Sequence, residues 1–139
     1  MNSSVERGAW SVETEDQTKF RFESLEIWQR AAAATASLFV LAEKLDAKKF
    51  HRFAEQLRAA TLSISNNIAE GSGSDSPDDF ANFLKFSRRS VYEVASMLSL
   101  LTKNGYLDEK DAHPLLEELE QQSKMIFAFR RTLKTRPTS

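Results

Sequence analysis

The chain has 139 residues, the size of one domain with a substantial hydrophobic core. It contains no cysteine, which excludes disulfides, thiol catalysis and cysteine metal sites. The 19 Lys and Arg residues and the 20 Asp and Glu residues give a net charge of −1, which argues against a protein that is basic over its whole surface.

The first 19 residues mix Ser, Thr, Gly and acids without a sustained apolar period, so we expect residues 1–19 to form a disordered or loosely docked leader. This segment lacks the basic start and apolar run of a signal peptide. The longest apolar stretch, Ala31 to Ala42, is shorter than the roughly 20 residues that a membrane span needs. We therefore expect a soluble, cytoplasmic protein without a membrane partner.

Apolar residues recur at helical spacing in four segments, which predict helices over residues 23–45, 47–70, 77–104 and 108–135. Strand signals are nearly absent. Helices of comparable length with short connections favour an all-α, antiparallel up-down-up-down four-helix bundle. The bundle is expected to span residues 20–135, followed by a tail at 136–139.

Local signals refine these helices. The predicted core stripe of the first helix consists of Leu25, Trp28, Ala32, Thr35, Phe39 and Ala42. Ser76 followed by Pro77 is typical of a helix start, and Gly105 is expected to cap the third helix. Pro114 would remove a backbone hydrogen bond at a cost of about 3 kcal/mol, so we expect the regular part of the fourth helix to begin near His113.

A line of polar side chains borders the apolar stripe of the second helix. It consists of Gln56, Ser63, Asn67 and Glu70, and we group Arg58 and Gly71 with it. Solvated helix faces usually carry Lys and Glu, so a row of Gln, Ser and Asn indicates polar groups that are paired with a specific partner. We assign this line to buried pairing between helices or subunits, and we expect Gly71 to end the helix as a left-handed C-cap.

The third helix carries a second apolar line that one bundle does not need. Phe86, Met97 and Leu100 widen its apolar face to roughly 200°, where about 100° suffices. Exposing these side chains would create an adhesive patch, whereas a symmetric partner would bury them. We therefore predict a homo-oligomer, and the alternative is that these are ordinary surface hydrophobes.

Basic residues gather at the start of the second helix, on the third helix and at the end of the chain. The candidate nucleic-acid contacts are Lys48, Lys49, Arg52, Arg88, Arg89, Arg130, Arg131, Lys134 and Arg136. Repeated around an oligomer, such clusters would form a basic rim with salt-dependent affinity for phosphates. The alternative is that the terminal basic residues complement a helix dipole. The acidic start of the fourth helix and the lack of exposed aromatic residues among the basic ones argue against binding.

Catalytic and metal chemistry find little support. A di-iron bundle needs Glu-x-x-His motifs, but Lys48 and Lys110 precede the two histidines, His51 and His113, by three residues. The Gly-Ser segment after the second helix lacks the preceding strand and the lysine of a phosphate-binding loop. No histidine is placed to activate a serine. We expect that the protein is not an enzyme and binds no metal or cofactor. We expect Glu70 and Glu93 to form ion pairs with Arg58, Arg88 or Arg89.

Four segments of the chain resemble a known family. They are FESLEIWQRA (22–31), QLRAATLSISNNIAEG (56–71), FANFLKFSRRSVYE (80–93) and NGYL (104–107). The chain resembles the 23S rRNA intervening-sequence proteins and, more distantly, the accessory proteins of diversity-generating retroelements. The resemblance implies an antiparallel four-helix bundle that assembles as a ring, with a pentamer favoured. The retroelement relatives bind a reverse transcriptase and nucleic acid.

The sequence departs from this pattern in two places. The usual acid near the start of the second helix is replaced by the run from Lys48 to His51, and the usual Gly-Ser pair of the third helix by Arg89 and Ser90. The chain also lacks the strongly basic charge of the retroelement proteins.

Three functions follow as hypotheses. The first is a non-enzymatic homo-oligomeric scaffold or adaptor, with RNA or an RNA-handling enzyme as its client. The second is a direct RNA- or DNA-binding accessory protein, such as a partner of a reverse transcriptase. The third, a small-molecule enzyme, would require a closed cavity with convergent polar groups in the bundle core.

Overall fold

The computed structural model describes residues 20–135, so the predictions for residues 1–19 and 136–139 lie outside the described part of the chain. A short 3-10 helix, η2 (Arg21–Ser24), precedes four long helices: α3 (Glu26–Ala47), α4 (His51–Ser72), α5 (Pro77–Lys103) and α6 (Glu109–Lys134). Residues 20–135 contain no strand. The prediction of an all-α four-helix bundle is confirmed.

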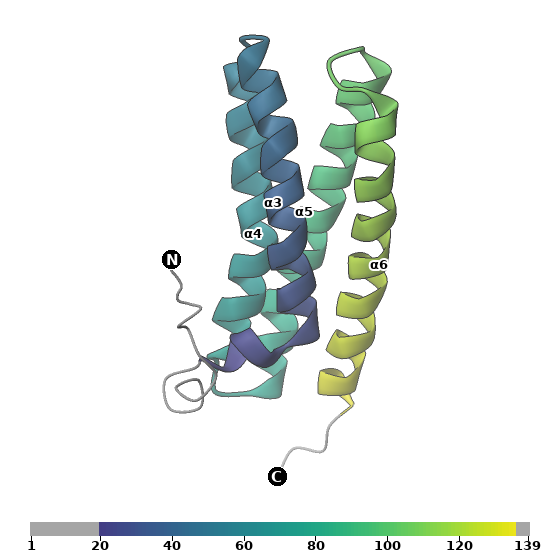
Figure 1. The fold of residues 1–139 in the computed structure, drawn as a ribbon. Coiled ribbons are helices and arrows are strands. Elements are labelled where there is room, and N and C mark those ends of the chain that lie inside the picture. The colour runs from purple at the N-terminus through teal and green to yellow at the C-terminus, as the bar shows by residue number, and fades with distance from the viewer. Residues whose placement is uncertain (1–19, 136–139) are drawn as a thin grey trace, which may run out of the picture.

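Each helix packs against the next one along the chain, and α3 also contacts α6 (Figure 1). The connections α3–α4 and α5–α6 meet at one end of the bundle, where Lys48 Nζ donates to the carbonyl of Tyr106 at 3.0 Å. Near the opposite end, Arg130 of α6 donates to the carbonyl of Ala81, close to the start of α5.

The buried face of α3 differs from the predicted stripe. It consists of Ile27, Ala31, Ala34, Leu38, Leu41, Ala42 and Leu45. Of the predicted residues only Ala42 is buried, while Trp28 and Phe39 are half-buried. The segment is rich in alanine, so two overlapping arcs both satisfy helical spacing. Packing against α4 and α6 selects the arc that carries the leucines, and Trp28 lies instead against Phe22 of η2, with ring centroids 4.8 Å apart.

Gly71 is not the left-handed cap that the sequence suggested. It lies inside α4, which continues to Ser72 and is capped by Gly73. A Cβ atom at position 71 would come within 2.7 Å of Phe80 Cδ1 and of Phe83 Cβ. The glycine therefore allows α5 to approach α4 closely, which is a packing role and not a conformational one.

Two residues do adopt the left-handed conformation at helix ends. Gly105 has φ 83° and follows α5, as predicted. Lys49 has φ 69°, and the amide of Phe50 donates to the carbonyl of Leu45 at 2.9 Å, so α3 ends in a Schellman-type motif without a glycine. The predicted start of the second helix at residue 47 is wrong, because this turn occupies the residues up to the start of α4 at His51.

The starts of α5 and α6 show one success and one error. Ser76 Oγ accepts a hydrogen bond from the amide of Asp79 at 3.1 Å, and Pro77 is the first residue of α5, as predicted. Helix α6 begins at Glu109 with Asp108 as its N-cap residue, close to the predicted boundary at residue 108, but its regular part does not wait until His113, because Pro114 lies inside it. Pro114 is exposed and close to the helix start, so water can solvate the carbonyl that loses its partner.

Candidate functional site

Two different surfaces adjoin on helix α5, one toward α6 and the other toward α4. The α5–α6 groove is lined by Lys85, Arg88, Arg89, Tyr92, Phe127 and Arg130. The α4–α5 face combines the apolar line of α5 with the polar line of α4, and comprises Phe86, Met97, Leu100, Gln56, Ser63, Asn67 and Glu70. At about 100° per residue, the α5 residues of each surface share a side of the helix.

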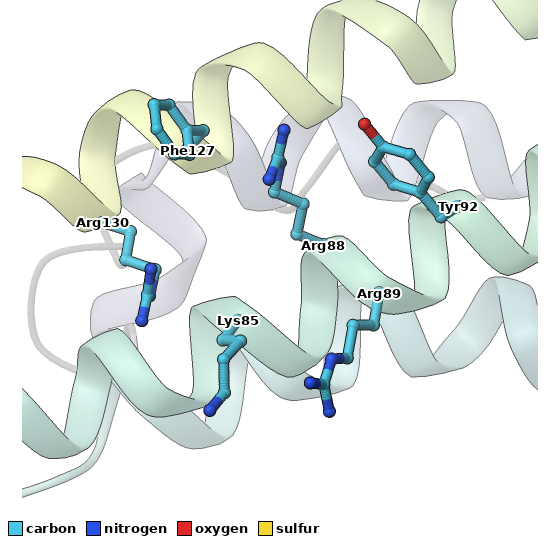
Figure 2. A pocket seen from close by; sticks show the side chains of 6 residues that line it. All are labelled: Lys85, Arg88, Arg89, Tyr92, Phe127 and Arg130. Carbon is cyan, nitrogen blue, oxygen red and sulfur yellow. The ribbon is translucent and has the colours of Figure 1, made fainter.

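The α5–α6 groove is an open depression of about 350 Å³. Four of its six lining residues are cationic, two are aromatic and none is acidic. Figure 2 shows Arg88 extending from α5 toward α6 between Phe127 and Tyr92, with Lys85 and Arg89 on the same helix and Arg130 on α6. The groove therefore combines positive charge with aromatic surface.

Arg88 is the organising side chain of the groove. Its guanidinium carbon lies 5.4 Å from the ring centroid of Tyr92 and 4.8 Å from that of Phe127. Its Nε donates to the carbonyl and the hydroxyl of Ser123, at 3.2 and 3.1 Å. Cation–π contacts and hydrogen bonds together fix the guanidinium in the groove before any ligand arrives.

The other cations of the groove are anchored more loosely. Arg130 Nε donates to the carbonyl of Ala81 at 3.1 Å, and Arg89 is exposed. Arg131 is adjacent to the groove, with its guanidinium carbon 5.9 Å from the ring centroid of Phe127. The structure therefore brings together four of the predicted nucleic-acid contacts: Arg88, Arg89, Arg130 and Arg131.

The expectation that no exposed aromatic residues accompany the basic ones is wrong. Tyr92 is 61% exposed and Phe127 is 40% exposed, and both line the groove. Lys85, Tyr92 and Phe127 were missing from the predicted site. The helical spacing of Lys85 and Tyr92 relative to Arg88 and Arg89 could have indicated that these two residues belong to the site. Phe127 reaches the groove only because α6 packs beside α5.

The remaining predicted cations lie outside the groove. Lys48, Lys49 and Arg52 are exposed near the α3–α4 connection, where Lys48 donates to the Tyr106 carbonyl. Lys134 lies 3.7 Å from Asp78, and Arg136 lies outside the described residues.

The predicted ion pairs are also replaced by others. Arg58 Nη2 contacts Asp46 Oδ2 at 2.6 Å, and His51 Nδ1 contacts Asp46 Oδ1 at 2.7 Å. The hydrogen bonds from Arg58 and then from His51 lower the pKa of Asp46. Arg88 is held by Ser123 and not by a carboxylate. Arg58 and Arg88 therefore have partners other than the predicted Glu70 and Glu93.

The polar line of α4 meets α5 at its centre. The hydroxyls of Ser63 and Ser90 lie 2.8 Å apart, and Asn67 Nδ2 donates to the carbonyl and the hydroxyl of Ser63, at 2.8 and 3.1 Å. Gln56 and Glu70, at the two ends of the line, are exposed. The centre of the line thus joins two helices, while its ends face outward.

The apolar part of the α4–α5 face is open as well. Phe86 is 42% exposed and Leu100 is 57% exposed, whereas Met97 is half-buried against the core. A shallow groove of about 230 Å³ lies between the ends of α4 and α5 and is lined by Phe53, Gln56, Met97, Leu100, Leu101, Asn104 and Tyr106.

Helices α3 and α6 are joined by ion pairs away from both surfaces. Arg30 donates to both carboxylate oxygens of Glu118, at 3.1 Å from Nε and 2.6 Å from Nη2, and Gln122 donates to the same carboxylate at 3.0 Å. The hydrogen bond from Arg30 lowers the pKa of Glu118, although burial opposes this effect. Lys44 likewise lowers the pKa of Asp111, which it contacts at 2.9 Å.

Residues 20–135 contain no group of three or more His, Asp or Glu side chains that could hold a metal ion. None of the helices in this part of the chain has the length and apolar character required to cross a membrane.

The fold and its surfaces define a small all-α bundle in which an apolar face and a cationic, aromatic groove adjoin on one helix, α5. Residues 23–128 match the family model described as 23S rRNA-intervening sequence protein. The chain belongs to this family. No curated protein matches the sequence.

Proposed function

We propose that the protein is a non-enzymatic homo-oligomeric scaffold or adaptor that assembles through its α4–α5 face. The observation that carries this proposal is the exposure of Phe86 and Leu100 on one side of α5, while the core side of the same helix is already filled by Val94 and Leu98, both 0% exposed. Burying these exposed apolar side chains in a second copy would remove an adhesive patch from water.

The centre of the α4–α5 face suits close packing. Ser63 and Ser90 are small and already hydrogen-bonded to each other, so a neighbouring helix can approach them without stranding a polar group. Gln56 and Glu70 are exposed beside them and offer hydrogen-bonding groups to a partner. In a ring, which the family resemblance favours as a pentamer, this face would meet a different surface of the next copy.

The test is the mass in solution at micromolar concentration. The double variant Phe86→Asp/Leu100→Asp is expected to sediment or scatter as a single chain of 15.8 kDa, while the native chain gives a multiple of that mass. Val40→Asp is the matched control, because Val40 is also apolar and 50% exposed but lies on α3. A native chain that measures 15.8 kDa contradicts the proposal.

A second function, direct binding of RNA, is favoured by the α5–α6 groove. Its six lining residues include four cations and no acid, so phosphate groups meet attraction without a competing carboxylate in the lining. The groove lies between α5 and α6 and adjoins the α4–α5 face on helix α5, where Lys85 Nζ lies 5.7 Å from the ring centroid of Phe86. An oligomer would then present several grooves to one RNA molecule and bind it multivalently.

The second function is tested with a structured RNA titrated at several salt concentrations. Replacing Lys85 and Arg89 by Glu should weaken binding about tenfold or more and flatten its salt dependence, because each lost phosphate contact lowers the slope by roughly 0.7 to 0.9. The matched control replaces Lys48 and Arg52 by Glu, which makes the same charge change near the α3–α4 connection. Equal losses in both variants would contradict binding at the groove.

A further inference from the structure

The shape and chemistry of the α5–α6 groove specify the form of nucleic acid more closely than its charge does. We propose that the groove holds one unpaired nucleotide of an RNA strand, with the base stacked on Tyr92 or Phe127 and the flanking phosphates held by Lys85, Arg89 and Arg130. This inference rests on the second proposed function, RNA binding, and names the state of the strand that is bound.

The two rings supply the first observation. Tyr92 and Phe127 come from different helices, and both expose a large part of their surface within a groove that is otherwise cationic. Both rings contact the Arg88 guanidinium, and each still exposes aromatic surface that phosphate groups do not need. An unpaired base has a free face that stacks on such a ring, whereas the bases of a double helix are stacked on one another.

Arg88 supplies the second observation. Its guanidinium lies between the two rings and is tied to Ser123 through Nε, so its plane is fixed in the free protein. A fixed guanidinium adds a stacking surface beside the rings and directs its terminal nitrogens toward a phosphate. Because the group is ordered in advance, little conformational entropy is lost when a nucleotide binds.

The size of the groove supplies the third observation. About 350 Å³ lies at the lower end of the roughly 300–1,000 Å³ found for pockets that hold small organic molecules. One nucleotide fits this scale, while a double helix could touch only the rim. Tight duplex binding relies on many phosphate contacts, and the four cations of the groove offer few.

RNA is favoured over DNA because loops, bulges and ends that splay their bases onto aromatic rings and guanidinium planes are the usual targets of RNA recognition. An acidic peptide could also pair with the cations, but its carboxylates would make no use of the exposed aromatic surface of Tyr92 and Phe127.

The experiment compares affinities for a labelled RNA decamer as a single strand, the same sequence within a hairpin stem, and the DNA single strand. The single-stranded RNA is expected to bind about tenfold or more tightly than the stem, since stacking on one aromatic ring strengthens binding by about that factor or more. The RNA carries 2-aminopurine at one position, and its fluorescence should fall on binding as the base stacks.

The variant Tyr92→Leu/Phe127→Leu removes both rings without changing any charge. It should lose about tenfold or more in affinity for the single strand and lose the fluorescence change, while the salt dependence of binding stays as it was. The single variant Tyr92→Phe, with Phe127 unchanged, keeps the ring and should bind nearly as tightly as the native chain, whereas the single variant Tyr92→Leu should bind less tightly. A thermal melt shows whether each variant is folded, which is expected because both side chains are well exposed.

Several results would overturn the inference: equal binding of the hairpin stem, equal or tighter binding of the DNA strand, displacement of the RNA by an equal concentration of a polyglutamate peptide, or an unchanged affinity in the leucine variant. If the leucine variant binds normally while the Lys85→Glu/Arg89→Glu variant does not, RNA binding stands and the stacking inference fails. If the native chain binds no RNA, both fail.

Discussion

The two surfaces that adjoin on α5 differ in the kind of partner that they suit. The α4–α5 face exposes Phe86 and Leu100 around small hydroxyl groups, a composition that suits an apolar surface of another copy. The α5–α6 groove exposes cations and rings, a composition that suits an anion with a flat face. Lys85 and Phe86 are neighbours in sequence, yet they belong to different surfaces because successive residues of a helix are turned by about 100°.

This difference teaches that one helix can serve two partners with different physical forces. Association through the α4–α5 face is expected to depend on apolar burial, which added salt does not weaken. Binding in the groove is expected to depend on counterion release, which added salt weakens strongly. Each prediction below separates the two surfaces or breaks the contacts that create them.

The largest expected effect is the response to salt. Raising the salt concentration from about 50 mM to about 200 mM should lower RNA affinity about tenfold or more, since several phosphate contacts compete with ions. The oligomer mass should not change over the same range. Fluorescence anisotropy and sedimentation of the same samples measure both quantities, and parallel changes in mass and affinity would show that the two surfaces are not independent.

The second prediction concerns the close approach of α4 and α5 at Gly71. Gly71→Ala should lower the free energy of unfolding by about 1–3 kcal/mol, because the added methyl group meets Phe80 and Phe83 at 2.7 Å. Gly73→Ala is the control, since its added Cβ comes no closer than 3.7 Å to the nearest atom, the carbonyl oxygen of Glu70. Urea unfolding of both variants measures the difference, and equal stabilities would mean that α5 moves aside without cost.

A smaller effect is expected from the hydrogen bond at the centre of the α4–α5 face. Ser90→Ala should cost about 1 kcal/mol, because Ser90 is buried and its hydroxyl lies 2.8 Å from that of Ser63. Ser96→Ala, at an exposed position of the same helix, is the control. A double-mutant cycle with Ser63→Ala measures the coupling, and additive losses would show that the two hydroxyls do not stabilise each other.

The smallest effect is a dependence of stability on pH that arises away from both surfaces. The folded state lowers the pKa of Glu118, so its ion pair contributes fully above the unfolded value of about 4.3, and this contribution is lost as the pH falls through the lower folded value. The melting temperature of the native chain should therefore fall below about pH 4, and it should fall more steeply than that of Glu118→Gln.

Glu120→Gln provides the control for that titration, because Glu120 is exposed and its ion pair with Lys124 on the same helix is long, at 3.8 Å. If the native chain and Glu118→Gln lose stability in parallel as the pH falls, a role for the Arg30–Glu118 contact is contradicted.

Much of the fold could be predicted because its signals are local. Ser76 and Pro77 mark the start of α5 through groups within one helical turn, and Gly105 ends it by adopting a conformation that glycine tolerates best. The end of α3 had no such signal, since Lys49 takes the left-handed conformation at a position that has no glycine. The start of α4 was therefore placed four residues too early.

The candidate site was predicted only in part, for a related reason. The cations on α5 and α6 are visible in the sequence, but the groove depends on bringing Arg88 beside Phe127 and Ser123, which lie on another helix. The spacing of one helix cannot show which side of a neighbouring helix it will face. The same limit explains Gly71, whose purpose is set by Phe80 and Phe83 of α5.

The sequence by itself determined the four helices, the lack of thiol chemistry, and the excess of apolar residues on α5, because composition and periodicity act within one segment. Only the tertiary structure decided which arc of α3 is buried, why residue 71 is glycine, and that Arg88 lies between two rings from different helices. These features depend on the distance and rotation between packed helices, and the jigsaw fit of large side chains sets both.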